Sequence, residues 1–201
     1  MSLVSRVLAV VLASATSATL AAQPAPSEAP VQHGASLAEK KGPAVDASDD
    51  PPLLATLAQV HTGERAMLDA VSPTQAAFEA LLSDRSTGEQ HSLDTQLLGL
   101  LRALASRHPG SRVELVSGYR SWKLNEMLRK KGHHVASHSQ HSLGHACDFR
   151  IVPPGAETGL DPRVLEAEIR KLGWDGGVGI YPTTADWFVH ADVGRNRRWV
   201  N

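Results

Sequence analysis

The most informative stretch of the sequence is Ser139-Gln140-His141-Ser142-Leu143-Gly144-His145-Ala146-Cys147-Asp148, together with Trp187-Phe188-Val189-His190 further along the chain. Histidine, aspartate and a distant histidine are the three protein ligands that a catalytic zinc takes while its fourth position stays open for water. Two separate parts of the chain therefore predict one metal site.

Both segments include an expected strand. Residues 146–152 alternate in character, so Asp148 points to the face opposite to Phe149. His190 lies in a second expected strand, residues 188–193, among apolar neighbours. A carboxylate or an imidazole in an apolar strand is costly unless it is paired or bound to a metal. We therefore expect these two side chains to converge on one ion, together with a histidine from the turn before the first strand.

The residue types suit zinc, because imidazole and carboxylate ligands without thiolate bind it well, although manganese or another divalent cation fits the same set. Five of the ten histidines lie between His133 and His145. A single histidine is more often a hydrogen-bonded core residue than a ligand, so composition alone does not select among them.

Helix-start signals precede four amphipathic segments, which begin at Ser72-Pro73, Ser92, Ser121 and Asp161-Pro162. Glycine predicts the end of the third at Gly132 and of the fourth at Gly173. Strands are expected at residues 113–116, 146–152, 178–181 and 188–193. Because helices and strands follow one another without a regular βαβ rhythm, we expect an α+β fold, with a small, mainly antiparallel sheet flanked by helices.

The N-terminal part has the pattern of an export signal. Residues 1–22 combine one positive charge with a short apolar run and end in the small pair Ala21-Ala22, which predicts a cleaved signal peptide; a retained anchor is the alternative. Residues 23–52 are rich in proline, alanine and serine, which predicts a disordered linker. The folded domain is then residues 53–201, with no stable membrane span after cleavage.

Composition excludes some classes of function. Lys and Arg total 20 against 21 for Asp and Glu, and this lack of basic excess argues against a nucleic-acid partner. The single cysteine, Cys147, forms no internal disulfide and is expected to be a small buried apolar residue. We expect a monomer.

A resemblance selects among the histidines. The pattern Ser139-x-His141-x-x-Gly144-x-Ala146-x-Asp148 resembles the zinc-binding signature of the D-alanyl-D-alanine peptidase group, whose fold is shared with the hedgehog signalling domain. Residues 53–199 also resemble the YcbK-like murein endopeptidase branch of this group. The segments that carry this second resemblance are His61-Thr62-Gly63-Glu64, Ser117-Gly118-Tyr119-Arg120-Ser121, Gly176-Gly177-Val178-Gly179 and Phe188-Val189-His190-Ala191-Asp192.

The resemblance implies that one zinc ion per chain is held by His141, Asp148 and His190. It also implies that Arg120 lies at the site and holds a carboxylate or a polarised carbonyl oxygen, which suits a guanidinium group. A structural ion pair is the alternative for this arginine. Tyr119 and Trp187 are expected to line the substrate groove.

The general base is where the sequence departs from the wider group, which places an acidic residue three positions before the last histidine ligand. Here that position is Trp187, and the nearest carboxylates are Asp186 and Asp192. Asp192 shares a strand face with His190, so we expect it to be the functional residue, either as the base or as the group that fixes the tautomer of His190. Asp186 is the other candidate base.

Taken together, these features predict an exported, zinc-dependent peptidase of the periplasm or cell envelope. Its expected substrates, implied by the resemblance, are peptide cross-links or stem peptides of bacterial peptidoglycan. A metal-bound water would attack the peptide carbonyl after a carboxylate takes its proton. Two alternatives stay open: a D,D-carboxypeptidase acting on stem peptides, and a non-catalytic cell-wall-binding protein that keeps the metal.

Overall fold

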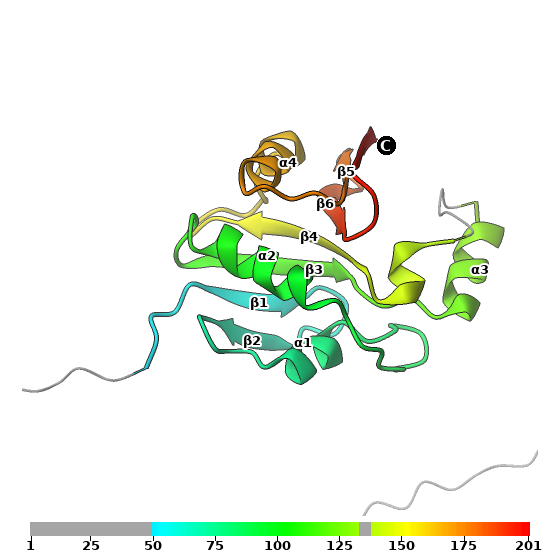
Figure 1. Ribbon diagram of the computed structural model, residues 1–201, viewed down its shortest axis with the longest axis horizontal. Helices are drawn as coiled ribbons and strands as arrows, with labels where there is room; N and C mark the ends of the chain where they lie inside the picture. Colours follow the sequence, from blue (N-terminus) through cyan, green and yellow to red (C-terminus); the bar gives the residue numbers. More distant parts are fainter. Residues whose placement is uncertain (1–49, 133–137) are drawn as a thin grey trace, which may run out of the picture. The chain divides into compact units, whose positions relative to one another are not determined.

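The computed structural model describes residues 50–132 and 138–201, which belong to one unit of the chain, residues 47–201 (Figure 1). The expected signal peptide and almost all of the expected linker lie outside the described residues. None of the helices within the described ranges has the length and apolarity needed to cross a membrane.

A mixed sheet of seven strands forms the frame of the domain, in the order β2-β1-β3-β4-β6-β5-β7. The strands are β1 (Ala55–Gln59), β2 (Arg65–Leu68), β3 (Ser111–Ser117), β4 (Ala146–Val152), β5 (Gly177–Pro182), β6 (Trp187–Asp192) and β7 (Arg197–Val200). The pairs β1/β3 and β5/β7 are parallel, and the other neighbours are antiparallel.

The α+β class is compatible with this architecture, but the expectation of a small, mainly antiparallel sheet is corrected to a larger, mixed one. β1, β2 and β7 were not predicted from the sequence. The two outermost strands, β2 and β7, have four residues each, too few to show a clear alternation. β1 is rich in alanine and leucine, which favour helices more than strands.

The helices are α1 (Gln75–Leu81), α2 (Thr95–Ala105), α3 (Trp122–Lys130) and α4 (Pro162–Lys171), with a short 3₁₀ helix, η1 (Gln140–Leu143). The expected starts of α3 and α4 are confirmed, because Ser121 and Asp161 accept hydrogen bonds from backbone N–H groups of the first turn. Figure 1 shows α3 and η1 beyond the end of the sheet where β3 finishes and β4 begins.

The other two helices begin later than expected. Thr74 caps α1 and Asp94 caps α2, each two residues after the serine predicted to start the helix. In both cases the later side chain accepts the backbone N–H of the first turn. A serine followed by a second capping residue is therefore ambiguous in the sequence.

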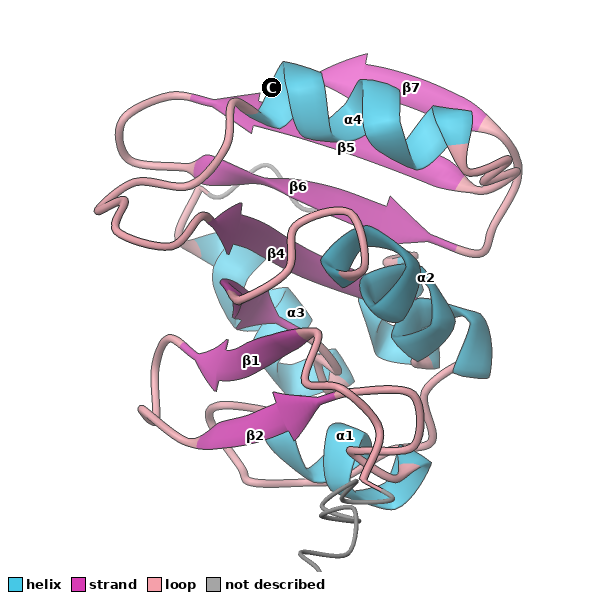
Figure 2. Ribbon diagram, turned by 90° about the vertical axis from the view of Figure 1, so that its left-hand side faces the viewer, coloured by secondary structure: helices cyan, strands magenta, loops and turns pink. Residues whose placement is uncertain are grey.

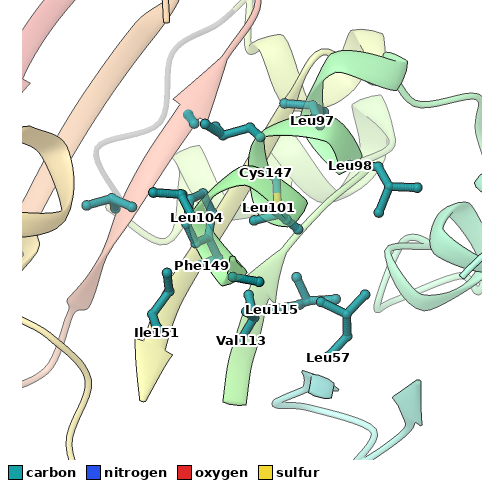
Figure 3. Close-up of a cluster of buried hydrophobic side chains, with 14 of the residues drawn as sticks. Leu57, Leu97, Leu98, Leu101, Leu104, Val113, Leu115, Cys147, Phe149 and Ile151 are labelled. Atoms are coloured by element: carbon teal, nitrogen blue, oxygen red, sulfur yellow. The ribbon is translucent and has the colours of Figure 1, made fainter. Parts of the chain in front are cut away.

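One face of the sheet is buried under α2 and α4 (Figure 2). Figure 3 shows the leucines of α2 against the apolar side chains of β3 and β4. The fully buried residues at this contact are Leu97, Leu101, Leu104, Val113, Leu115, Phe149 and Ile151. Removing this apolar surface from water stabilises the fold and fixes which face of each strand points inward.

The opposite face carries polar groups, because side chains alternate along each strand. Glu114 on β3 lies opposite Arg150 on β4, and Asp148 on β4 lies opposite His190 on β6. The apolar face therefore sets the strand register that places these charged and polar side chains side by side.

A buried carboxylate ties the loops beside this polar face together. Asp84, which is fully buried, accepts hydrogen bonds from the backbone N–H groups of Ser86 and Thr87 at Oδ1 and of Ser121 at Oδ2. Burial raises the pKa of Asp84, but hydrogen bonds from Ser121 and Ser86 outweigh it and hold the pKa well below its ordinary value. The carboxylate thus links the loop after α1 to the start of α3.

Asp84→Asn should lower the free energy of unfolding at pH 7 by about 1–3 kcal/mol, because the amide cannot accept all these hydrogen bonds. Because the pKa of Asp84 is lower in the folded state than in the unfolded state, its carboxylate stabilises the fold fully when the pH lies above the unfolded-state pKa of about 3.9. This stabilisation is lost as the pH falls through the folded-state pKa. In urea denaturation, the difference in the free energy of unfolding between wild type and Asp84→Asn should therefore be smaller at pH 3 than at pH 7. The exposed Glu157→Gln is the control, and equal stability of variant and wild type at pH 7 would contradict the assignment.

Candidate metal centre

The structure brings His141, Asp148 and His190 together. Their ligand atoms all lie within 4.8 Å of one another, and all three residues are buried. His141 comes from η1, Asp148 from β4 and His190 from β6. Three elements that are separate in sequence therefore place an imidazole, a carboxylate and a second imidazole at one point.

Local structure explains how η1 delivers its histidine. Gly144 ends η1 with φ at 71°, the left-handed conformation that glycine adopts most readily, and the chain then turns directly into β4. A Cβ atom at this position would collide with the backbone oxygen of Ser92. Gly144 therefore allows the tight turn that sets His141 beside Asp148.

The ring of His141 presents a lone pair to the cluster. Its Nδ1 lies 2.7 Å from the carbonyl oxygen of Gly118, which can only accept, so Nδ1 carries the proton. Burial, with the nearby Arg120 charge, lowers the pKa of His141 to about 4, so the ring is neutral at pH 7. Nε2 is then unprotonated, and it lies 3.1 Å from Oδ1 of Asp148 and 3.1 Å from Nη2 of Arg120, which can donate to it.

The ring of His190 is also held by an acceptor outside the cluster, but through Nε2, while its Nδ1 faces the cluster. Nε2 lies 2.9 Å from Oδ2 of Asp192, a carboxylate that accepts the N–H, and Nδ1 lies 2.8 Å from Oδ1 of Asp148. Burial lowers the pKa of His190, but the contacts with Asp148 and Asp192 outweigh it, so the net shift is upward. A metal ion at this point would compete with a proton for Nδ1.

The separations within the cluster fit a divalent cation. Nε2 of His141 and Nδ1 of His190 are 3.1 Å apart, and they lie 3.1 and 2.8 Å from Oδ1 of Asp148. Ligands of a tetrahedral zinc, each about 2.0–2.1 Å from the ion, are roughly 3.3 Å from one another. Lone pairs directed at one point repel unless a cation or a proton lies between them.

Arg120 lies at the edge of this cluster, as the sequence predicts. Its Nη2 donates to Oδ2 of Asp148 at 2.5 Å, and its Nε donates to Oγ of Ser117 at 2.9 Å. The ion pair is nearly buried, with 12% of the arginine side chain exposed. Asp148 thus has one oxygen engaged by arginine while the other faces the two imidazoles.

Asp192 lies behind His190, on the side of the ring away from Asp148. It is fully buried, and Arg197 donates to both of its oxygens, at 2.8 and 3.2 Å. The backbone N–H of Gly194 donates to Oδ1. Gly177 on β5 leaves the necessary space, since a Cβ there would collide with the carboxylate. These contacts fit a group that holds the imidazole in place better than one that takes a proton from water at the metal.

A cleft of about 510 Å³ lies beside the cluster. Its lining includes Asp148, Arg120, Asp186 and Trp187, so four of the sequence-predicted site residues share it. Other lining side chains, which were not predicted as site residues, are His61, Arg85, Arg150, Tyr181 and Phe188. Arg150 lies two residues after Asp148 on the same face of β4, so alternation along the strand could have indicated it. His61 and Arg85 lie in loops, where no spacing rule connects them to the cluster.

Tyr119 is not among the residues that line this cleft, so its expected role in substrate binding stays a prediction. Its ring stacks on His91 with the centroids 4.6 Å apart, its hydroxyl lies 3.4 Å from Glu89, and it packs into the apolar core. The neighbouring Arg120 points to the metal cluster instead. Trp187 does line the cleft, and its Nε1 donates to the carbonyl oxygen of Gly159 at 2.9 Å.

Comparison with known proteins agrees with this geometry. The family model described as "Peptidoglycan L,D-endopeptidase MepK", a peptidase M15 model, matches residues 48–199. The chain belongs to this family. The resemblance seen in the sequence is thereby confirmed, and the metal cluster, Arg120 and the cleft all lie within the part of the chain that the MepK family model matches.

Two curated relatives show the extent of the similarity. The chain is 31% identical to the probable peptidoglycan L,D-endopeptidase MepK of Haemophilus influenzae over 162 residues. The aligned stretch covers 76% of this chain and 81% of the relative. The chain is 32% identical over 161 residues to the peptidoglycan L,D-endopeptidase MepK of Escherichia coli K12, covering 74% and 80%. No solved structure gives a significant match.

His141→Ala or Asp148→Ala should abolish tight binding of one divalent ion per chain, because each removes one of three protein ligands. The loss should exceed the about 10–100-fold drop that follows removal of an outer hydrogen-bond partner. Elemental analysis and titration with Co²⁺, followed by visible absorption, measure it. His61→Ala is the control, since that ring lines the cleft without touching the cluster. Full metal content in either alanine variant would overturn the ligand set.

Proposed function

We propose that this protein is a zinc-dependent murein endopeptidase that hydrolyses peptide cross-links in bacterial peptidoglycan. The observation that carries the proposal is the convergence of His141, Asp148 and His190 beside an open cleft. Because the relatives are named L,D-endopeptidases, we assign the scissile bond to one that joins an L-centre to a D-centre.

Zinc is the proposed ion, and the three ligand atoms fit it. Two imidazole nitrogens and one carboxylate oxygen lie at separations that suit tetrahedral coordination, and three protein ligands leave a position open. When bound, zinc supplies a water with a pKa of about 7 and polarises the substrate carbonyl. The carbonyl oxygen of Gly118 then orients the ring of His141, and the carboxylate of Asp192 orients the ring of His190, each by accepting a hydrogen bond from the ring N–H.

Arg120 is proposed to have two tasks. Its Nη2 holds Oδ2 of Asp148, which keeps the other carboxylate oxygen directed at the ligand cluster. Its guanidinium also lines the cleft, so a free N–H can donate to the carbonyl oxygen as negative charge develops there. The planar arrangement of donors in arginine makes these two contacts compatible.

The proton of the attacking water needs an acceptor, and we assign this role to Asp186. Among the described residues that line the cleft, Asp148 and Asp186 are the carboxylates, and Asp148 is engaged as a ligand. Asp192 is enclosed by His190, Arg197 and Gly194, so we assign it to orienting His190. Of the two roles that the sequence left open for Asp192, the proposal keeps the one that fixes the tautomer of His190, and it takes Asp186, the other candidate, as the base.

The substrate also bears on location. Peptidoglycan lies outside the cytoplasmic membrane, so the proposed activity requires export. The signal-like residues 1–22 and the linker-like residues 23–52 support a route to the periplasm or cell envelope. We further propose that the folded domain, residues 53–201, acts as a monomer.

The purified protein should convert L,D-cross-linked muropeptide dimers to monomers, and a chelator should stop this reaction until zinc is restored. Mass spectrometry of the products measures the cleavage and identifies the bond, with D,D-cross-linked dimers as the comparison. Loss of a terminal D-alanine from uncross-linked peptides would instead indicate a D,D-carboxypeptidase. Metal-loaded protein that leaves every muropeptide intact would support the non-catalytic alternative.

The two aspartates should behave differently when each is changed to asparagine. Asp186→Asn should lower kcat by roughly 10²–10⁴-fold with normal metal content, because it removes the proton acceptor. Asp192→Asn should weaken zinc affinity by about 10–100-fold, with turnover recovered at excess zinc. Glu157→Gln controls for a lost surface charge. An inactive Asp192→Asn variant that keeps its metal, beside a normal Asp186→Asn, would return the role of base to Asp192.

A further inference from the structure

The cleft has a second group of polar side chains away from the metal ligands. His61, in the turn between β1 and β2, and Arg85, in the loop between α1 and α2, both line it. Nη1 of Arg85 lies 3.1 Å from Nε2 of His61. Two loops that are distant in sequence therefore bring an imidazole and a guanidinium to the same wall of the cleft.

Arg85 differs from the other arginines of the cleft in its surroundings. Arg120 pairs with Asp148, and Arg150 pairs with Glu114 at 2.5 Å. Within residues 50–132 and 138–201, no carboxylate lies within ion-pair distance of Arg85. Its positive charge therefore faces the cleft without an acidic partner in the described part of the chain.

The loop that carries Arg85 is held rigidly. The adjacent Asp84 carboxylate, fully buried, fastens Ser86 and Thr87 on one side and the N–H of Ser121 on the other. Ser121 directly follows Arg120, so one carboxylate fixes the backbone beside both arginines. Such preorganisation lowers the entropy lost when a ligand binds.

An arginine with free donors in a cleft is suited to a carboxylate, which it can bind through two parallel hydrogen bonds. Stem peptides of peptidoglycan carry free carboxylates on their D-glutamate and diamino-acid residues, separate from the bond that is cut. We infer that Arg85, with His61 beside it, forms a subsite for one of these carboxylates. The inference rests on the proposed function, and it assigns Arg85 to positioning the substrate rather than to the chemical step.

Kinetics on matched substrates test this subsite. The probes are an L,D-cross-linked dimer with free carboxylates, the same dimer amidated at D-glutamate, and the same dimer amidated at the diamino acid. Wild-type protein should prefer the free acid over one of the amides by about 10–100-fold in kcat/KM. Arg85→Gln should lower kcat/KM for the acid to the level of that amide and leave the amide unchanged, whereas Arg85→Lys should keep part of the preference.

The controls separate charge, folding and function. Arg107→Gln removes an exposed arginine outside the cleft and should keep the full preference. Metal content of Arg85→Gln should equal that of the wild type, since Arg85 does not touch the ligands. An unchanged preference in Arg85→Gln, or no preference in the wild type, would overturn the inference while leaving the endopeptidase assignment intact.

Binding provides a readout that does not depend on hydrolysis. Calorimetry with the metal-loaded protein compares the uncross-linked stem tetrapeptide, as the acid and as each amide, for wild type and Arg85→Gln. Weaker binding of one amide to the wild type, with no such difference in the variant, supports the subsite. Equal binding of acid and amides, or no binding of any, overturns it. If the wild type cleaves no dimer, the proposed activity fails and the binding result alone decides the subsite.

Discussion

The register between β4 and β6 is the constraint on which the site depends. It sets Asp148 directly opposite His190, and the next pair, Phe149 and Val189, faces the core. Because side chains alternate along a strand, a slip of one residue would move phenylalanine to the polar face and bury the aspartate under α2. The apolar contacts of one face therefore determine the chemistry that is possible on the other.

Each proposed ligand is also restrained by a partner from another element. The carbonyl oxygen of Gly118 fixes the tautomer of His141, Asp192 fixes that of His190, and Arg120 engages one oxygen of Asp148. Burying these polar groups costs free energy unless each one is hydrogen-bonded. The network meets that condition, and it directs Nε2 of His141, Nδ1 of His190 and one oxygen of Asp148 toward a single point.

Sequence could predict the cluster of proposed ligands because two independent signals agreed. Alternation along residues 146–152 placed Asp148 on the polar face, and the resemblance selected His141 from a histidine-rich segment. The starts of α3 and α4 were likewise evident, since each has one capping residue. Where two capping residues follow one another, as before α1 and α2, the sequence does not show which side chain reaches the backbone.

The remaining features depend on contacts between distant residues. Tyr119 follows a glycine in a segment without strand alternation, so its direction toward the core is not visible in the motif. The role of Asp192 depends on Arg197, whose strand β7 was not recognised at all. Asp186 and Arg85 lie in loops, where spacing carries little information about direction.

Arg197 links the site to the edge of the sheet, because it lies on β7 and donates to Asp192. β7 is an outermost strand of four residues whose described pairing is with β5 alone, and such strands open locally at little cost in free energy. Opening of β7 would detach Arg197 from Asp192 and leave the ring of His190 less restrained, with every ligand still in place. Retention of a metal at the proposed centre would then be sensitive to fraying of a strand that supplies none of the proposed ligands, and slow amide exchange in β7 would be a condition for a well-ordered centre.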